Sequence, residues 1–250
     1  MKFFIITKRH IIFVLILTVI AISAGIPLSQ SIVSASAKKL PVYCVGREDK
    51  VISFSFDAAW DDADTPQLIE IFNKYNVKTT FFVVGEWVDK YPDSVKAFAD
   101  AGHEIMNHSD THPHIASLSK EQMKKEIVDC NKKIKAVTGK EPDLHRGPYG
   151  EYNNLLIDTL SEMNILCIQW DIDSLDWKDL SADEIYNRVV PKVRPGSIIL
   201  FHNGAKHTPE ALPKIIEQLQ ADGYKIVPVS ENIYRDGFTL NHEGRQIKTS

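Results

Sequence analysis

Short apolar segments of strand character alternate with amphipathic helical segments between residues 51 and 229, and this alternation constrains the fold most strongly. A strand–helix unit recurs about seven times along this stretch. Strands separated by helices pair in parallel through right-handed crossovers. Two α/β architectures satisfy the pattern, an open doubly wound sheet and a (β/α) barrel. Strands are expected at 51–56, 79–84, 104–106, 165–170, 197–201 and 225–229.

Local signals mark the ends of several expected helices. Asp64 is placed to cap a helix whose first turn contains Pro66. Ser119 and Gln122 form a capping-box pattern, and the helix that they open is expected to end at Gly139. The expected helices are 65–72, 92–101, 120–138, 155–163, 182–193 and 208–222.

Polar side chains follow the ends of several expected strands. They are Asp57, His108, Arg146, Asp173 and His202. In both candidate architectures the carboxyl ends of parallel strands meet at one rim, where the chemistry of such folds collects. Residues far apart in the sequence are therefore expected to share one site.

His108 and His112 are four residues apart and can offer two neutral imidazole nitrogens to one metal ion. Pro113 follows directly and ends any continuing helix. The residues between the two histidines are Ser, Asp and Thr, so the helical zinc-protease pattern, which carries a Glu there, is absent. His114 is a competing ligand, and His207 receives no role.

The N-terminal segment has the layout of a secretory leader. Lys2, Lys8 and Arg9 precede an apolar run over 11–22, and a small-residue site follows at 34–37. Residues 1–37 are expected to be a signal peptide or an N-terminal membrane anchor, and both readings stay open. Either one places the protein outside the cytoplasmic membrane, with membrane contact only through this segment.

Charge and cysteine content narrow the function classes. Beyond residue 37 acidic side chains outnumber basic ones, which argues against nucleic-acid binding. Three scattered cysteines are too few for a disulfide framework. Cys130 and Cys167 fall within apolar patterns and are expected to be buried.

Five ordered motifs resemble those of the polysaccharide deacetylase family (carbohydrate esterase family 4, the NodB-homology domain). The family fold is an irregular (β/α) barrel, which the resemblance selects here, with about seven parallel strands. The resemblance covers 50–233 as the catalytic domain, with 38–49 as a linker and 234–250 as a polar C-terminal tail. The motifs are Ser55-Phe56-Asp57, His108-Ser109-Asp110-Thr111-His112, Arg146-Gly147-Pro148-Tyr149, Asp173-Ser174-Leu175-Asp176-Trp177 and Leu200-Phe201-His202.

The resemblance implies a metal-assisted hydrolysis. His108 and His112 would hold a divalent metal, expected to be zinc, with cobalt or nickel as alternatives. Asp57 would be the general base and His202 the general acid. Arg146 would hold Asp57 and lower its pKa.

Further motif residues are implied to position the acid and the substrate. Asp176 would pair with His202 and keep it protonated. A backbone N–H near Tyr149 would help to bind the oxyanion. Trp177 and Leu200 would line the pocket for the acetyl methyl group.

One position departs from the family pattern. The family carries a second Asp, the third metal ligand, where this chain has Ala58. Asp61 or Asp62 could substitute, Asp57 could itself contact the metal, or the metal could bind weakly. The altered first motif resembles a sporulation-associated branch of the family.

These features predict an exported, metal-dependent hydrolase that removes N-acetyl groups from amino sugars of a cell-wall glycan, with peptidoglycan as the expected polymer. The alternative is a catalytically weak glycan-binding domain that retains the fold, which Ala58 favours. A third reading is hydrolysis of another small amide or ester. No feature of the sequence indicates an oligomeric state.

Overall fold

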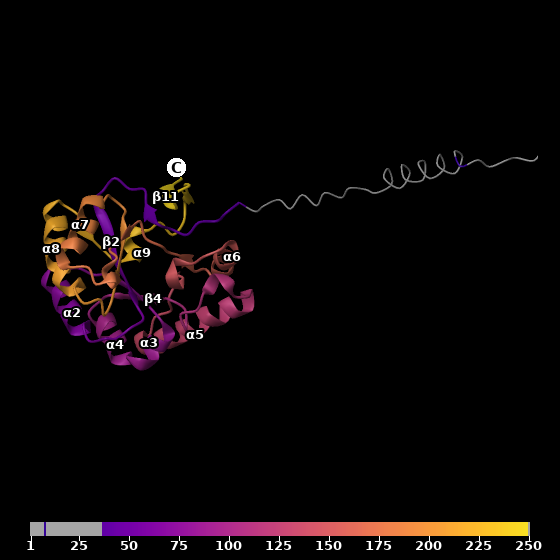
Figure 1. The fold of residues 1–250 in the computed structure, drawn as a ribbon, viewed down its shortest axis with the longest axis horizontal. Coiled ribbons are helices and arrows are strands. Elements are labelled where there is room, and N and C mark those ends of the chain that lie inside the picture. The colour runs from indigo at the N-terminus through magenta and orange to yellow at the C-terminus, as the bar shows by residue number, and fades with distance from the viewer. Residues whose placement is uncertain (1–7, 9–36, 250) are drawn as a thin grey trace, which may run out of the picture. The chain divides into compact units, whose positions relative to one another are not determined.

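The computed structural model describes Lys8 and residues 37–249 of the chain (Figure 1). The predicted leader or anchor, apart from Lys8 and Ala37, lies outside these described residues. Residues from Lys38 onward form one compact unit. Within the described part of the chain, no helix is long and apolar enough to cross a membrane.

A parallel sheet forms the centre of this unit. Its strands lie in the order β6-β5-β4-β3-β2-β8-β7, and β9 pairs with β2. All of these pairings are parallel, so the predicted α/β barrel architecture with about seven parallel strands is confirmed. The strands are β2 (Val51–Ala58), β3 (Thr80–Val83), β4 (Glu104–Asn107), β5 (Leu144–His145), β6 (Leu166–Cys167), β7 (Ile172–Asp173), β8 (Ile198–His202) and β9 (Lys225–Ile226).

Helices follow the strands and surround the sheet (Figure 1). The sequence missed α3, because a helix of six residues is too short to show a periodic apolar face. Residues 225–229, expected as one strand, divide into β9 and α9. The helices are α2 (Thr65–Lys74), α3 (Gly85–Lys90), α4 (Pro92–Asp100), α5 (Lys120–Thr138), α6 (Asn154–Glu162), α7 (Ala182–Val189), α8 (Thr208–Ala221) and α9 (Val229–Asn232).

The helix caps follow the sequence signals in part. The capping box of Ser119 and Gln122 is formed, and α5 ends at Gly139, which has a left-handed φ of 74°. Asp64 precedes α2, but its side chain does not cap the helix. Its carboxylate accepts a hydrogen bond from the backbone N–H of Gly204 at 2.8 Å instead. The predicted Asp64 cap is therefore wrong.

The segments expected as a linker and a tail are both folded. Strand β1 (Cys44–Val45) pairs with β11 (Arg245–Lys248), which pairs with β10 (Phe238–Leu240). Val42 also bridges Ile168, beyond the end of β6, and Cys44 bridges Ser197, just before β8. The segment around β1 thus contacts the main sheet near β6 and near the start of β8, and it also pairs with the C-terminal strand β11.

Strand β2 separates an apolar layer from a polar interior. Phe54 and Phe56 pack in the main apolar cluster, where the Phe56 ring stacks on Phe201 with centroids 5.3 Å apart. Ser55 and Asp57 face the other way, toward the guanidinium group of Arg146. Because side chains alternate between the two faces of a strand, β2 places the polar side chains of Ser55 and Asp57 on the face that leads to the site. The three cysteines are free and buried, as predicted for Cys130 and Cys167.

Candidate active site

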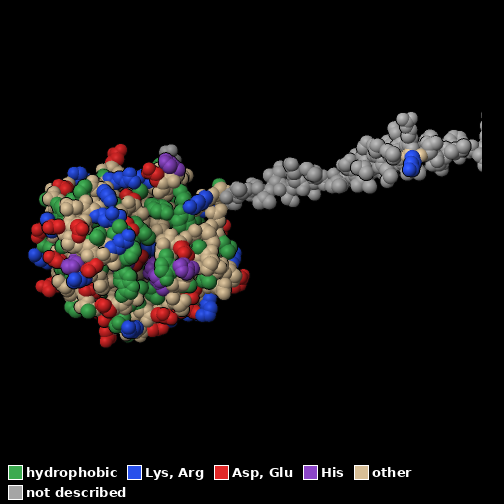
Figure 2. Space-filling view, in the orientation of Figure 1, with side chains coloured by type: hydrophobic (Ala, Val, Ile, Leu, Met, Phe, Trp, Pro, Cys, Tyr) green, Lys and Arg blue, Asp and Glu red, His purple; other side chains and the backbone are tan. Residues whose placement is uncertain are grey.

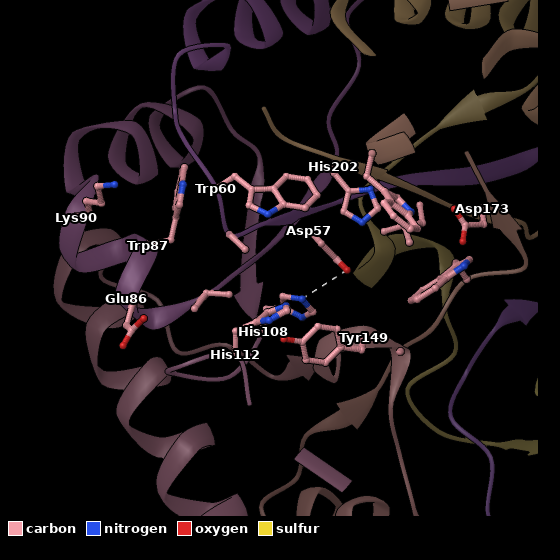
Figure 3. A pocket seen from close by; sticks show the side chains of 16 residues that line it. Asp57, Trp60, Glu86, Trp87, Lys90, His108, His112, Tyr149, Asp173 and His202 are labelled. Carbon is pink, nitrogen blue, oxygen red and sulfur yellow. Dashed lines mark ion pairs between the residues drawn. The ribbon is translucent and has the colours of Figure 1, made fainter. Parts of the chain in front are cut away.

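A pocket of about 760 Å³ lies at the carboxyl ends of the strands (Figure 3). On the face shown in Figure 2, histidine side chains reach the surface beside hydrophobic ones. Residues from all five sequence motifs line the pocket, and Arg146, which opens the third motif, is fully buried and does not line it. The motif residues that line it are Asp57, His108, His112, Tyr149, Asp173, Trp177, Leu200 and His202.

Arg146 is fully buried and holds Asp57 in place. Its Nη1 donates to Asp57 Oδ1 at 2.8 Å, and its Nη2 donates to Ser55 Oγ at 2.9 Å. The guanidinium group also lies 4.1 Å from the centroid of the Phe82 ring. A buried cation with fixed donors orients the carboxylate and leaves Oδ2 of Asp57 directed toward the pocket.

The electrostatic surroundings keep Asp57 ionised. Burial raises the pKa of this carboxyl, but the nearby His108, Arg146 and His202 outweigh burial, and the net pKa lies below the usual range. Oδ2 of Asp57 lies 3.6 Å from Nε2 of His108. A carboxylate held ionised with one free oxygen can accept a proton from a bound water.

The two histidines of the turn are arranged as neutral nitrogen donors. His108 Nδ1 lies 2.8 Å from the carbonyl oxygen of Arg146, which only accepts hydrogen bonds, so the proton is on Nδ1 and Nε2 is free. The two rings lie 5.1 Å apart. Burial and His108 lower the pKa of His112 to about 4, which keeps its imidazole neutral. These are the forms in which histidine binds metals.

Two polar side chains that the sequence analysis did not single out hold this turn. Glu126 of α5 accepts hydrogen bonds from the backbone N–H groups of Asp110 and Thr111 at 2.9 and 2.8 Å. Asn107 accepts one from the backbone N–H of Ser109 at 2.8 Å. The contact of Glu126 joins segments 15 and 16 residues apart, so no local pattern in the sequence could reveal it, whereas the contact of Asn107 is local.

His202 and Asp176 form a buried acid pair. Nδ1 of His202 donates to Asp176 Oδ1 at 2.7 Å, while Oδ2 accepts from Thr208 Oγ1 at 2.7 Å. Burial lowers the pKa of His202, but the hydrogen bond and charge of Asp176 outweigh it, and the net pKa is raised. His202 is registered opposite Asp57 in the sheet. The two strands therefore place an imidazole and a carboxylate side by side.

Aromatic side chains surround the opening of the pocket. Tyr149 is 62% exposed and adopts a left-handed φ of 57°. Its ring stacks on His114, whose Nδ1 is hydrogen-bonded to the carboxylate of Glu151 at 2.8 Å. Trp177 is 51% exposed. The competing ligand His114 is thus engaged elsewhere and does not line the pocket.

The structure does not bring the proposed substitute ligands to the histidine pair. Asp61 is exposed, and its carboxylate accepts from the backbone N–H of Ala63 at 3.2 Å. Asp62 accepts from the hydroxyl of Ser94. Ala58 is fully buried in the main apolar cluster. Asp61, which was suggested as a third ligand, therefore does not line the pocket.

The donor set fits a divalent cation held by two imidazoles. His108 and His112 supply neutral nitrogens, and Asp57 Oδ2 is an available oxygen 3.6 Å from His108 Nε2. Among residues 37–249, no group of three or more His, Cys, Asp or Glu side chains is arranged to hold a metal ion. With two firm ligands, we expect a weaker metal site than one with three.

Comparison with known proteins identifies the family. Residues 45–168 match the family model for polysaccharide deacetylase. A peptidoglycan-N-acetylglucosamine deacetylase of Bacillus cereus is 34% identical over 75% of this chain and 90% of its own length. Another protein of that name from the same species is 35% identical, and the chain spans 66% of its length. The peptidoglycan-N-acetylmuramic acid deacetylase PdaC of Bacillus subtilis is 35% identical, and the chain spans 39% of its length.

Solved structures agree with this comparison. A CE4-family pseudoenzyme from Bacillus anthracis is 29% identical, with a TM-score of 0.75 over 83% of this chain and 70% of that chain. A mutant of that pseudoenzyme is described as having restored enzymatic activity, and it is 30% identical with the same TM-score. The Bc1960 peptidoglycan N-acetylglucosamine deacetylase is 32% identical, with a TM-score of 0.75 over 77% of this chain and 92% of its own. This chain therefore belongs to the polysaccharide deacetylase family.

Proposed function

We propose that this protein hydrolyses the N-acetyl groups of amino sugars in a cell-wall glycan, with peptidoglycan as the polymer, and that it acts outside the cytoplasmic membrane. The observation that carries the proposal is the pair of Asp57 and His202 in register at one rim. The pKa of Asp57 is lowered by its cationic neighbours, and the pKa of His202 is raised by Asp176. Amide hydrolysis needs such a base and such an acid together.

His108 and His112 would hold a divalent cation, with zinc as our expectation. Bound there, the cation would polarise the acetamide carbonyl and make a water acidic enough to lose its proton near neutral pH. Asp57 accepts that proton on Oδ2, because Oδ1 is engaged by Arg146. The weak donor set predicts that zinc is removed readily by a chelator.

His202 completes the reaction by protonating the amine as it leaves. Asp176 accepts a hydrogen bond from Nδ1–H of His202 and keeps the ring oriented. Nε2 is then free to donate toward the substrate. Leu200 and Trp177 line the same pocket and give an apolar surface for the acetyl methyl group. Tyr149, on the other side, supports the sugar.

The test is acetate release from N-acetylglucosamine oligomers and from peptidoglycan, before and after metal removal. We expect activity that is lost on chelation and restored by zinc. Asp57→Asn and His202→Gln are expected to lower kcat by about 10²- to 10⁴-fold each. A folded wild-type protein loaded with zinc that releases no acetate from either substrate would overturn the proposal.

A second function is glycan binding without catalysis. Ala58 supports it, since the residue is buried among apolar side chains and supplies no metal ligand. The pseudoenzyme from Bacillus anthracis is a relative with the same fold. In this case the protein binds the glycan oligomers, but acetate release stays at background with zinc, cobalt or nickel. The same measurements thus separate the two functions.

A further inference from the structure

Two loops that follow neighbouring strands meet next to the proposed acid. One leads from β2 to α2 and contains three aspartates, and the other leads from β8 to α8. The fully buried Asn203 joins them, because its side-chain amide donates to the backbone carbonyl of Asp61. The backbone N–H of Gly204 donates to Asp64 Oδ2 at 2.8 Å. We call the meeting point of the two loops, made by Asp61, Asp64, Thr65 and Asn203, the acidic junction.

The junction concentrates negative charge around Gly204. Its backbone N–H binds Asp64, and a Cβ at this glycine would lie 3.4 Å from Asp61 Oδ1. The pKa of the Asp64 carboxyl is raised to about 6, chiefly by burial and further by the charges of Asp61 and Asp62. Lys90 attracts Asp61 and Asp62, but the main influences on Asp64 within residues 37–249 include no cationic side chain. At neutral pH Asp64 is therefore ionised, and a bound cation would offset its charge.

Three buried oxygen atoms of the junction have no hydrogen-bond partner among residues 37–249. They are Asp64 Oδ1, Thr65 Oγ1 and Asn203 Oδ1. The side chains of Thr65 and Asn203 belong to residues that are only 3% and 0% exposed. Because the Asn203 amide donates to the loop of aspartates, its unpaired oxygen lies against the same loop. Buried polar atoms are nearly always paired, so unpaired oxygens from both loops indicate a ligand at this point.

The chemistry of these oxygens favours calcium. Carboxylate, amide and hydroxyl oxygens are ligands for hard cations, and calcium accepts about six to eight of them in a flexible arrangement that water completes. Magnesium demands a near-ideal octahedron and gives up its waters reluctantly. The junction contains two carboxylates and no histidine or cysteine, so it differs in kind from the imidazole pair proposed to hold zinc. A water molecule could pair with the oxygens but would leave the charge of Asp64 without a counterion.

We propose that the acidic junction is a calcium site, separate from the catalytic centre, in which Asp61, Asp64 and Asn203 are ligands. Calcium bound there joins the loop after β2 to the loop after β8. It thereby fixes the backbone that follows Trp60 and His202, whose rings lie 5.3 Å apart (Figure 3). The inference goes beyond the proposed function, because calcium binding at this point requires no hydrolysis.

The experiment titrates zinc-loaded protein with calcium chloride in a calorimeter. We expect one calcium ion per chain with a Kd of about 10⁻⁴–10⁻³ M, the range of extracellular calcium modules, and weaker binding of magnesium. Asp61→Asn and Asp64→Asn keep the shape of the side chain and remove its charge, and each is expected to weaken calcium binding by about tenfold or more. Asp236→Asn, the same change at an exposed aspartate outside the junction, is the matched control.

Thermal unfolding gives a second readout. In calcium-free buffer, Asp64→Asn is expected to unfold at the same temperature as wild type or higher, because the amide removes a charge that has no counterion. Calcium is expected to raise the Tm of wild type and Asp236→Asn but not that of Asp64→Asn.

Two results would overturn the calcium site. One is a wild-type protein that binds no calcium at about 10 mM, well above the Kd expected for an extracellular site. The other is equal calcium affinity, or an equal rise in Tm, in wild type and Asp64→Asn, which would mean adventitious binding only. Neither result depends on acetate release, so failure of the calcium site is distinguishable from failure of the proposed function.

Discussion

Arg146 and Asp57 are coupled in the buried interior beneath the pocket. Arg146 is fully buried, and it also donates to Ser55 and to the backbone carbonyl of Gln169. Removing the guanidinium group leaves a buried carboxylate without its counterion, which is costly because the interior cannot solvate the charge. The same pair therefore has a structural effect that is separate from its proposed role in hydrolysis.

We predict that Arg146→Met lowers the free energy of unfolding by about 3 kcal/mol or more. The double variant Arg146→Met/Asp57→Asn loses less than the sum of the single changes, because the second change removes the unpaired charge. Urea denaturation of the four proteins measures this coupling. Additive losses would contradict the predicted pairing.

His103 is a buried histidine that lies outside the site. It lowers the stability of the folded protein at acidic pH. Its ring packs against Phe72, Phe81 and Phe98, and its Nδ1 accepts from the backbone N–H of Thr79 at 3.2 Å. Burial lowers its pKa to about 4. The unfolded chain therefore binds a proton near pH 6.5 that the folded protein does not bind until about pH 4.

Between these pH values the free energy of unfolding should fall as pH decreases. We predict that His103→Asn, which keeps an acceptor for Thr79, makes this fall shallower by about 1.4 kcal/mol per pH unit. Chemical denaturation at a series of pH values between 4 and 7 measures the slope. His242→Asn, the same change at an exposed histidine, is the control.

At the scale of elements, α5 supports the histidine turn from outside the pocket. The Glu126 carboxylate accepts hydrogen bonds from two backbone N–H groups and from the Thr111 hydroxyl, and it therefore fixes the turn that carries His112. Partners of this kind around metal ligands commonly contribute about 10- to 100-fold to metal affinity. The helix therefore positions ligands that it does not itself supply.

We predict that Glu126→Gln weakens zinc binding by about tenfold, because a neutral amide accepts the hydrogen bonds of the two backbone N–H groups more weakly than a carboxylate does. Equilibrium dialysis with zinc measures the change. Glu70→Gln on α2 is the matched control, since Glu70 is exposed and does not line the pocket. Unchanged zinc affinity in Glu126→Gln would show that the turn holds its shape without this contact.

Long strands and capped helices were predictable from the sequence, whereas short elements were not. The apolar runs around β2, β3 and β8 are long enough to show their period. Residues 165–170 were expected as one strand, but only Leu166–Cys167 is strand β6, and Ile168 bridges Val42. Helix α3, which lines the pocket with Glu86, Trp87 and Lys90, gave no local signal in the sequence.

The site was predictable where chemistry follows a strand end. That Asp57, His108 and His202 would lie at one site could be predicted because parallel strands end at one rim. Glu126 could not, because its contact with the turn is made across the space between α5 and β4. The exposure of Trp60 also depends on a loop conformation held by Asn203. Contacts of this kind are set by tertiary packing, which no periodicity in the sequence records.

At the scale of the whole molecule, the C-terminal hairpin ties both ends of the described chain together. Gln246 of β11 is fully buried, accepts from the backbone N–H of Tyr234 and donates to its carbonyl, each at 2.8 Å. We predict that Gln246→Ala lowers the free energy of unfolding by about 1–3 kcal/mol, because two buried backbone groups lose their partners.

Thermal and urea unfolding measure the loss of stability in Gln246→Ala. Thr239→Ala on β10 is the control, since the Thr239 side chain is exposed and its removal should change stability by less than about 0.5 kcal/mol. Equal stability of the two variants would mean that the hairpin is held by its strand pairing alone and that Gln246 contributes nothing to it.

The central position of β2 bears on how the chain reaches this structure. An early strand in the chain, β2 pairs with β3 soon after it, but its other neighbours, β8 and β9, come from near the C-terminus. Such distant pairings form late and slowly during folding, and their absence leaves an apolar strand edge open to aggregation. A chain still being synthesised therefore lacks both its complete core and the meeting of Asp57 with His202. Synthesis must proceed past residue 226 before folding can assemble a catalyst.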